Sequence, residues 1–186
     1  MKILKWTVIV FAILGVLFFF VISPYIKKQT KKHSPEQTVS YTKNGMDLTV
    51  NYSSPSKKNR VIFGELVPYD VVWRTGANEP TTFSTENDIK VAGENLPAGT
   101  YSLWTRPNRQ SWSIIFNKYI PEWGVSILSG GKETTRIEKE DVIEIEIPTK
   151  ETIETIENFT INFEMETQLF MSISWDRTLV KIPISK

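Results

Sequence analysis

Cysteine is absent from this chain of 186 residues, and histidine occurs only once, at His33. Without thiols the protein can form no disulfide, bind no metal through thiolates and carry no lipid on an N-terminal cysteine. His33 precedes the region that we expect to fold, so that region has no imidazole for a Ser-His-Asp triad or a zinc or copper site. We therefore expect no cofactor and no metal. Any catalysis would have to use carboxylate, tyrosine, lysine, arginine or hydroxyl groups.

Acidic residues are absent before Glu36, whereas six of the 22 basic residues precede it. From Glu36 onward the chain has 21 acidic and 16 basic residues, a net charge of −5. This negative charge argues against nucleic acid as a partner. The lysines at 27–32 would either meet anionic lipid headgroups or form a solvated spacer.

The N-terminal segment contains a long apolar run, in which only Thr7 is polar between Trp6 and Ile22. About 20 helical residues span about 30 Å, the thickness of the hydrocarbon core of a bilayer. We therefore expect a transmembrane anchor over residues 1–26, with the lipid bilayer as its partner. Trp6 and Tyr25 would lie at the two edges of the span, where amphipathic rings favour the headgroup region.

A cleaved signal peptide is the alternative interpretation of this segment. Its apolar region usually has about 7–15 residues and precedes a cleavage site of small residues. The run is longer here, and the sequence VISPY that ends it is a poor site. We expect Pro24 to end the helix. Lysines on both sides of the run leave the orientation open, and we favour a single-pass membrane protein whose C-terminal domain is extracytoplasmic.

Residues 27–37, KKQTKKHSPEQ, have no hydrophobic period and are expected to form a basic polar tether. The domain that follows, 38–186, alternates apolar and polar residues as half-buried strands do. The alternating segments are 46–52, 89–91, 101–105, 111–116, 143–147, 159–165, 169–175 and 180–184. Pro148 is expected to end one strand, and Pro183 predicts an edge position for the last one. The pattern predicts an all-β domain, an antiparallel, jelly-roll-like β-sandwich of roughly nine strands.

The segment 62–79, IFGELVPYDVVWRTGANE, concentrates the groups that could bind a polar ligand. Trp73 could stack on a sugar ring, and Arg74 could hold a carboxylate or a phosphate. In the competing interpretation the segment is a loop tied down by its own side chains, with Trp73 in the core. A further aromatic residue in a turn completes the set of candidate ligand-binding residues: Tyr69, Trp73, Arg74, Asn78, Glu79 and Trp123.

Three carboxylates of this region, Glu65, Asp70 and Glu79, could hydrolyse a glycoside if two of them faced one cleft about 5–10 Å apart. The acidic run at 138–141 lacks the ligand spacing of a calcium loop, so solvated strand faces are the simpler interpretation of such runs. We therefore name no catalytic residue.

Three stretches, IFGELVPYDVVWRTGANEPTTF, DIKVAGENLPAGTYSLWTRP and SWSIIFNKYIPEWG, resemble the bacterial family catalogued as domain of unknown function 2911. The resemblance extends over about residues 40–184. It implies an exported or envelope-associated bacterial β-domain, and it implies no activity, cofactor or catalytic residue. A cleaved signal peptide is the more usual front end in this family than a long anchor.

Taken with the residues, the resemblance predicts a membrane-anchored envelope module that binds a polar ligand or a partner protein through residues 68–79. The ligand would be a polar small molecule, a glycan or an envelope protein. One alternative is a carboxylate-dependent hydrolase that acts on envelope glycans. The other is a purely structural envelope protein, in which the WRTGANE segment holds the sheets together.

Overall fold

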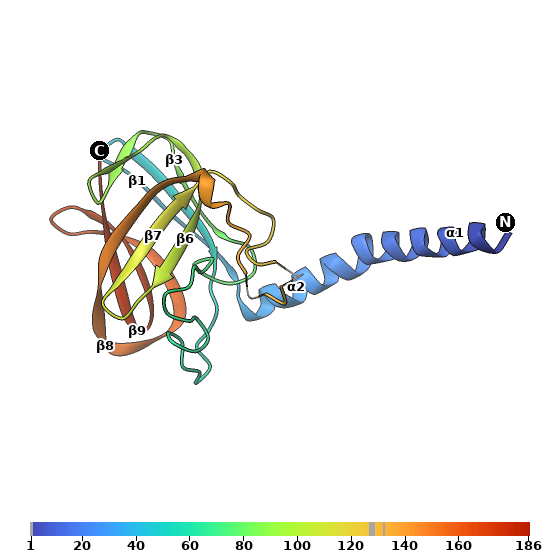
Figure 1. Cartoon of the computed structure of the whole chain (residues 1–186). Coiled ribbons are helices and arrows are strands. Elements are labelled where there is room, and N and C mark those ends of the chain that lie inside the picture. The colour runs from blue at the N-terminus through green and yellow to red at the C-terminus, as the bar shows by residue number, and fades with distance from the viewer. Residues whose placement is uncertain (1, 127–128, 132) are drawn as a thin grey trace. The chain divides into compact units, whose positions relative to one another are not determined.

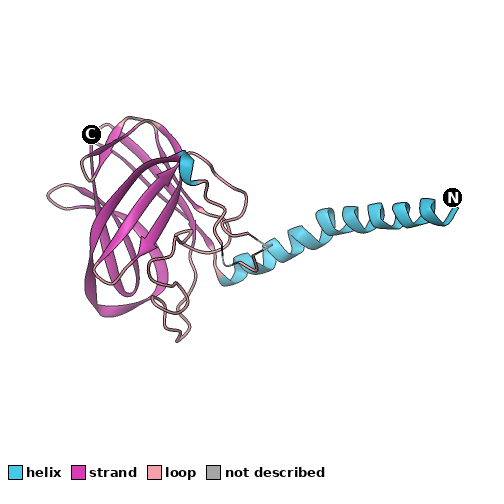
Figure 2. Ribbon diagram, in the orientation of Figure 1, coloured by secondary structure: helices cyan, strands magenta, loops and turns pink. Residues whose placement is uncertain are grey.

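A computed structural model describes residues 2–126, 129–131 and 133–186 of the chain (Figure 1). The chain divides into two compact units, Met1–His33 and Ser34–Lys186, and we call the second unit the β-domain. The first unit is helical, whereas the β-domain consists of strands and loops with one short 3-10 helix at Glu138–Glu140 (Figure 2).

The helical unit consists of α1 (Lys2–Leu17), a π-helical turn (Phe18–Ile22) and α2 (Ser23–His33). The expectation that Pro24 ends the helix is wrong, because Pro24 is the second residue of α2. Proline lacks the N–H that would bond to a carbonyl one turn earlier, and the five residues just before α2 form the π-helical turn.

Residues 27–33 of the expected tether belong to α2, and Glu36 already begins the first strand. No helix in the described part of the chain has the length and hydropathy that a bilayer span requires. The structure therefore does not support the transmembrane helix expected over residues 1–26. The side chains of Trp6, Ile22 and Tyr25 are exposed.

The described residues of the β-domain form nine strands, all paired in antiparallel fashion within one sheet. The strands are β1 (Glu36–Lys43), β2 (Met46–Ser53), β3 (Thr81–Thr85), β4 (Ile89–Val91), β5 (Glu94–Leu96), β6 (Gly99–Pro107), β7 (Ser111–Asn117), β8 (Asp141–Met165) and β9 (Leu169–Ser185). Their order in the sheet is β1-β2-β3-β6-β7-β8-β9-β4-β5. The predicted all-β antiparallel class is thus confirmed.

Strand β8, with 25 residues, joins the two halves of this sheet. It pairs with β7 from Asp141 to Pro148 and with β9 from Thr149 to Met165. The sheet curls around a shared interior (Figure 1), and the hydroxyl of Tyr52 in β2 reaches the carbonyl oxygen of Ile161 in β8 at 3.3 Å. The strands thus form one open, curled sheet and not the two separate sheets of the expected jelly-roll-like sandwich.

Pro148, which was expected to end a strand, and Pro183, which was expected to mark an edge strand, both lie inside long strands. Pro148 lies opposite Ser111, where the pairing of β8 passes from β7 to β9, so its missing N–H removes little from either ladder. Pro183 lies in β9, which has β8 and β4 as neighbours, so the expected edge position is wrong. The described pairing of β9 with β8 ends at Val180. On the side of β9 that faces β4, the carbonyl of Pro183 accepts the Ala92 N–H at 2.8 Å.

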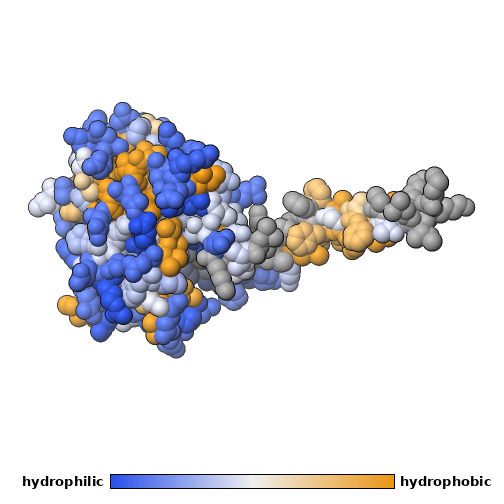
Figure 3. Space-filling model, viewed as in Figure 1, coloured by the Kyte–Doolittle hydropathy of each residue, from blue (hydrophilic) through white to orange (hydrophobic). Residues whose placement is uncertain are grey.

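The interior of the curled sheet is one apolar core built from the inward-facing residues of the strands. Aromatic rings meet edge-to-face within it, as Trp73 does with Phe159 at a centroid distance of 5.2 Å. Each fully buried large side chain contributes about 1.5–3 kcal/mol to folding. On the face of the β-domain seen in Figure 3, patches of apolar residues lie between hydrophilic ones.

Candidate functional site

The candidate segment begins with Trp73, which pairs with β6. The Trp73 N–H donates to the carbonyl of Thr105 at 2.7 Å, and the Thr105 N–H donates back at 3.0 Å. The indole is 9% exposed and stacks on Trp175 with a centroid distance of 6.1 Å. Trp73 therefore packs in the core, as the competing interpretation expects, and offers no free face to a sugar.

The next residues are held by their own polar groups. The buried Thr75 hydroxyl donates to the Thr105 hydroxyl at 3.1 Å, and the Thr81 hydroxyl donates to the Thr75 carbonyl at 2.5 Å. A Cβ on Gly76 would lie 2.9 Å from the Ser53 carbonyl oxygen, so only glycine fits this approach to the end of β2. Thr75 and Gly76 thus have a structural role in fastening the loop to the curled sheet.

Arg74, between these fixed residues, lacks such partners. Its side chain is half-buried, and its buried Nε has no hydrogen-bond partner among the described residues. The arginines that form ion pairs in the described part of the chain are Arg106, Arg136 and Arg177. Burial lowers the pKa of the Arg74 guanidinium from its ordinary value, because the charged form loses hydration.

Arg74 lines a pocket of about 360 Å³, which we call the Arg74 pocket. Its described walls come from residues 66–74 and, on the other side, from Val125, Gly131 and Thr134. The lining residues are Leu66, Val67, Pro68, Val71, Val72, Trp73, Arg74, Val125, Gly131 and Thr134. Leu66 and Val71 are 44% and 46% exposed, so the pocket carries apolar side chains that solvent also reaches. A cationic group therefore lies among walls that are mainly apolar.

Gly124 contacts Arg74 from the opposite segment. A Cβ on Gly124 would lie 2.4 Å from the Arg74 Cδ, and the Gly124 N–H donates to the Asn78 carbonyl at 3.3 Å. Asn78 is 9% exposed, and its Nδ2 also has no hydrogen-bond partner among the described residues. The Arg74 Nε and the Asn78 Nδ2, which have no acceptor among the described residues, thus belong to two residues that both contact Gly124.

The other predicted site residues lie elsewhere. Tyr69 lies under the guanidinium of Arg109, 5.0 Å from the ring centroid. Glu79 lines a different pocket, next to β1 and β2. Trp123 is half-buried, and its backbone carbonyl accepts a hydrogen bond from the Thr135 hydroxyl at 2.5 Å. Tyr69, Glu79 and Trp123 are not among the residues that line the Arg74 pocket. The wall residues 66–74 lie within the candidate segment 62–79, whereas sequence reasoning missed Gly124 and the wall residues after it, for which the only signal was the turn sequence PEWG.

The three carboxylates considered for hydrolysis do not meet in any pocket described for the chain. Glu65 is exposed, and the Asp70 carboxylate accepts a hydrogen bond from the Asn108 amide at 2.7 Å. Glu79 instead shares its pocket with Glu36. Among the described residues there is also no group of three acidic or histidine side chains that could hold a metal ion.

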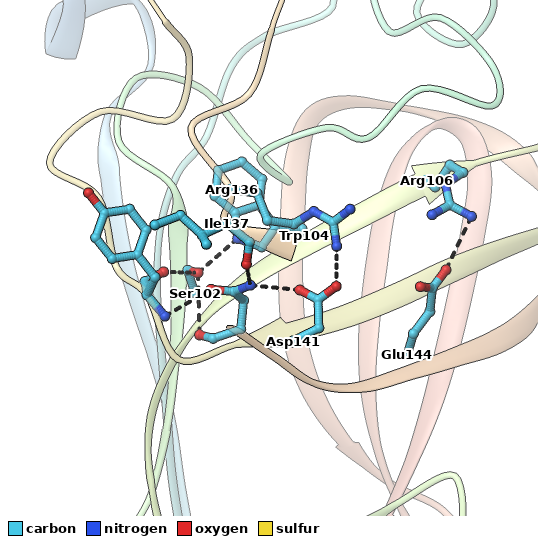
Figure 4. Close-up of polar contacts among 9 residues, drawn as sticks. Ser102, Trp104, Arg106, Arg136, Ile137, Asp141 and Glu144 are labelled. Atoms are coloured by element: carbon cyan, nitrogen blue, oxygen red, sulfur yellow. Dashed lines mark hydrogen bonds and ion pairs between the residues drawn. The ribbon is translucent and has the colours of Figure 1, made fainter. Parts of the chain in front are cut away.

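A polar network on β6, β7 and β8 holds the two ends of the loop that joins β7 to β8 (Figure 4). The Asn117 amide donates to the Ile137 carbonyl at 2.7 Å and to Asp141 at 2.6 Å. Arg136 forms an ion pair with the same Asp141 carboxylate. These contacts hold the C-terminal end of the 118–137 loop against the start of β8.

The N-terminal end of this loop is held in the same region. The Ser102 hydroxyl donates to the Tyr119 carbonyl at 2.7 Å and accepts the indole N–H of Trp104 at 2.8 Å. Trp104 is fully buried although it follows the core residue Leu103, so it lies on the opposite face of β6. The loop that forms one wall of the Arg74 pocket is therefore attached at both ends.

A family model described as "Protein of unknown function (DUF2911)" matches residues 34–184, which include nearly all of the β-domain and the whole Arg74 pocket. No curated protein and no solved structure matches the chain. The match covers far more than half of the sequence and agrees with the resemblance carried by the WRTGANE and LPAGTY stretches. The chain therefore belongs to the DUF2911 family.

Proposed function

We propose that the β-domain is a non-catalytic binding module that holds a small anionic ligand in the Arg74 pocket. One observation carries this proposal: a half-buried guanidinium lines a mainly apolar pocket, and its buried Nε has no acceptor among the described residues. The proposal keeps the predicted binding role of the loop and narrows its contact residues to Arg74, with Asn78 nearby.

The energetics of unpaired donors support a bound acceptor. A buried polar group left without a hydrogen bond costs about 1–3 kcal/mol, and a charged group costs more. The free energy lost at Arg74 would be recovered if an anion occupied the pocket, since a guanidinium binds carboxylate or phosphate through two parallel N–H donors. On the same loop the hydroxyls of Thr75 and Thr81 donate to protein groups, whereas the Arg74 Nε and the Asn78 Nδ2 have no acceptor among the described residues.

The size and walls of the pocket fit a small molecule. A volume of about 360 Å³ lies near the lower end of the range of about 300–1,000 Å³ that is typical of ligand sites. Apolar walls exclude water from the neighbourhood of the charge and thereby strengthen its attraction to an anion. The described lining residues include no carboxylate, so none of them could serve as a carboxylate acid or base in catalysis.

Membrane attachment and an extracytoplasmic location stay predictions, carried by the apolar N-terminal run and its flanking lysines. Mass spectrometry of the mature chain tests the anchor, and a mature N-terminus near Pro24 would contradict it. Protease digestion of intact spheroplasts tests the orientation. We expect the β-domain to be cleaved before lysis, and complete protection would contradict the proposed location.

Binding at the pocket can be tested with the full chain in phosphatidylcholine nanodiscs. The probes are hexanoate and hexyl phosphate, with titrations into empty nanodiscs subtracted. We expect calorimetry to detect binding of at least one probe, and Arg74→Ala to weaken it at least tenfold. Arg177→Ala is the matched control, because the Arg177 side chain is 59% exposed and its ion pair with Glu151 is long, at 3.7 Å. If neither probe binds, or if both variants behave alike, the proposal is wrong.

A further inference from the structure

We infer that the ligand of the Arg74 pocket is an amphipathic monocarboxylate, a single carboxylate joined to a short apolar chain. This inference rests on the proposed binding function and names the chemical class of the ligand. Three features of the pocket lead to it: the number of charged side chains in its described lining, the geometry of the Arg74 guanidinium and the composition of the walls.

The charge count favours a monoanion. Among the described residues that line the pocket, Arg74 is the only ionisable one. One bound carboxylate would neutralise its single positive charge. A phosphate monoester, which carries about −1.5 to −2 charges at neutral pH, would leave an excess of negative charge between apolar walls. Such an excess is unfavourable because water that would otherwise solvate it is excluded.

The geometry of the guanidinium favours a planar headgroup. The buried Nε of Arg74 has no acceptor, and no hydrogen bond or ion pair among the described residues uses the rest of the guanidinium, so its N–H groups are left to bind a ligand. Two N–H groups on one guanidinium edge point in parallel and match the two oxygens of a carboxylate. Lysine, as a point charge, would not supply this pair of parallel donors.

The wall composition favours an apolar chain over a glycan. The side chains of Leu66, Val67, Val71, Val72 and Val125 line the pocket beside the guanidinium. A sugar would need hydrogen-bond partners for its hydroxyls, and the described lining offers only Thr134 as a side-chain hydroxyl. An alkyl chain would instead bury its methylenes against these walls, and each buried methylene should tighten binding about fourfold.

The test compares four probes by calorimetry at pH 8 with the full chain in phosphatidylcholine nanodiscs. Hexanoate carries both features, acetate lacks the chain, 1-hexanol lacks the charge and hexyl phosphate carries a second charge. We expect hexanoate to bind at least tenfold more tightly than each of the other three. We also expect Arg74→Lys to weaken hexanoate at least tenfold, which keeps the test usable if Arg74→Ala does not fold.

The outcomes separate the two proposals. If hexyl phosphate binds as tightly as hexanoate, and Arg74 substitution weakens both, the binding function stands and the monocarboxylate inference is wrong. Acetate binding as tightly as hexanoate would likewise overturn the inference, because the walls would then contribute nothing. If hexanoate binding does not change in Arg74→Lys or Arg74→Ala, both the inference and the proposed site are wrong.

Discussion

The backbone of Gly124 lies against the side-chain stem of Arg74, so closely that a Cβ on Gly124 would stand 2.4 Å from the Arg74 Cδ and 2.9 Å from its Cβ. The two residues are far apart in the sequence: Arg74 lines the pocket, and Gly124 precedes Val125, which lines the other wall. Their contact restricts the stem of the Arg74 side chain. A ligand would therefore meet an arginine whose position is already restricted, which lowers the entropy lost on binding.

Gly124→Ala is expected to displace the Arg74 side chain. The added methyl group cannot be accommodated at these distances, and overpacking of this kind costs about 1–3 kcal/mol. We expect urea unfolding to show this loss and calorimetry to show weaker hexanoate binding. Gly93→Ala is a control for the methyl group itself, since a Cβ there would meet nothing within 4 Å, although its φ of +92° adds backbone strain. Unchanged hexanoate affinity in Gly124→Ala would contradict this account of the pocket.

Thr75→Val is expected to destabilise the loop by about 1–2 kcal/mol, because the change removes the hydroxyl that donates to Thr105 at 3.1 Å inside the protein. A double-mutant cycle with Thr105→Val should give a coupling energy of at least about 0.5 kcal/mol. The exposed pair Ser84 and Thr100, with hydroxyls 2.9 Å apart, is the control, and Thr100→Val should change stability by less than about 0.5 kcal/mol. Additive effects at Thr75 and Thr105 would show that this bond does not fasten the loop.

Arg136→Ala is expected to loosen the 118–137 loop. The side chains of Arg136 and Asp141 are only 9% and 18% exposed, and removal of one partner of such a pair costs about 3 kcal/mol or more. Limited proteolysis should then cut within the loop sooner than in the unmodified chain. Arg106→Ala is the matched control: its ion pair with Glu144 is 36% and 41% exposed and should contribute less than about 1 kcal/mol. Equal cleavage rates in the two variants would contradict the proposed attachment.

The pair of Glu164 and Lys181 should give a pH-dependent contribution to stability. The hydrogen bond from Lys181 lowers the pKa of the Glu164 carboxyl from its ordinary value of 4.5. A lowered carboxyl pKa means that the contribution is present above the ordinary value and is lost as the pH falls through the folded-state value. Hydrogen bonds to Glu164 and Glu166 raise the pKa of Lys181, so on the alkaline side the contribution is lost as the pH rises through that raised value.

Glu164→Gln measures this contribution. Since the pair is partly exposed, we expect a loss of about 0.5 kcal/mol at neutral pH, which disappears once the pH is below the folded-state pKa of Glu164. Urea unfolding at pH 7 and in the acid range gives the comparison. Glu151→Gln is the control, because the ion pair of Glu151 with Arg177 is 76% and 59% exposed. If the unmodified chain and Glu164→Gln differ in free energy of unfolding by the same amount at both pH values, the contribution of the pair is not ionic.

Much of the β-domain could be predicted from alternation, since every alternating segment lies within a strand of the structure. The joining of segments 143–147 and 159–165 into one strand could not be predicted. Proline was expected to interrupt the first of them, but Pro148 lies at a change of pairing partner, where a missing N–H matters little. The alternation of apolar and polar residues predicts which face of the sheet a residue occupies. It does not predict which strands pair with one another.

The site was predictable in composition and not in geometry. Trp73 and Arg74 are adjacent in sequence, yet one packs in the core and the other lines a pocket. Whether the Arg74 Nε finds an acceptor depends on where every carboxylate and carbonyl lies in the fold, which sequence does not give; among the described residues it finds none. The contact with Gly124 was equally hidden, because it joins two loops that no short motif connects.

Because β8 supplies the partner strand to both β7 and β9, neither half of the sheet has an independent boundary at which it could detach. Loss of the hydrogen bonds around Pro148 would expose the edges of both halves at once. The β-domain should therefore melt in a single cooperative step, and amide hydrogens of β7 and β9 should exchange with solvent through the same global opening.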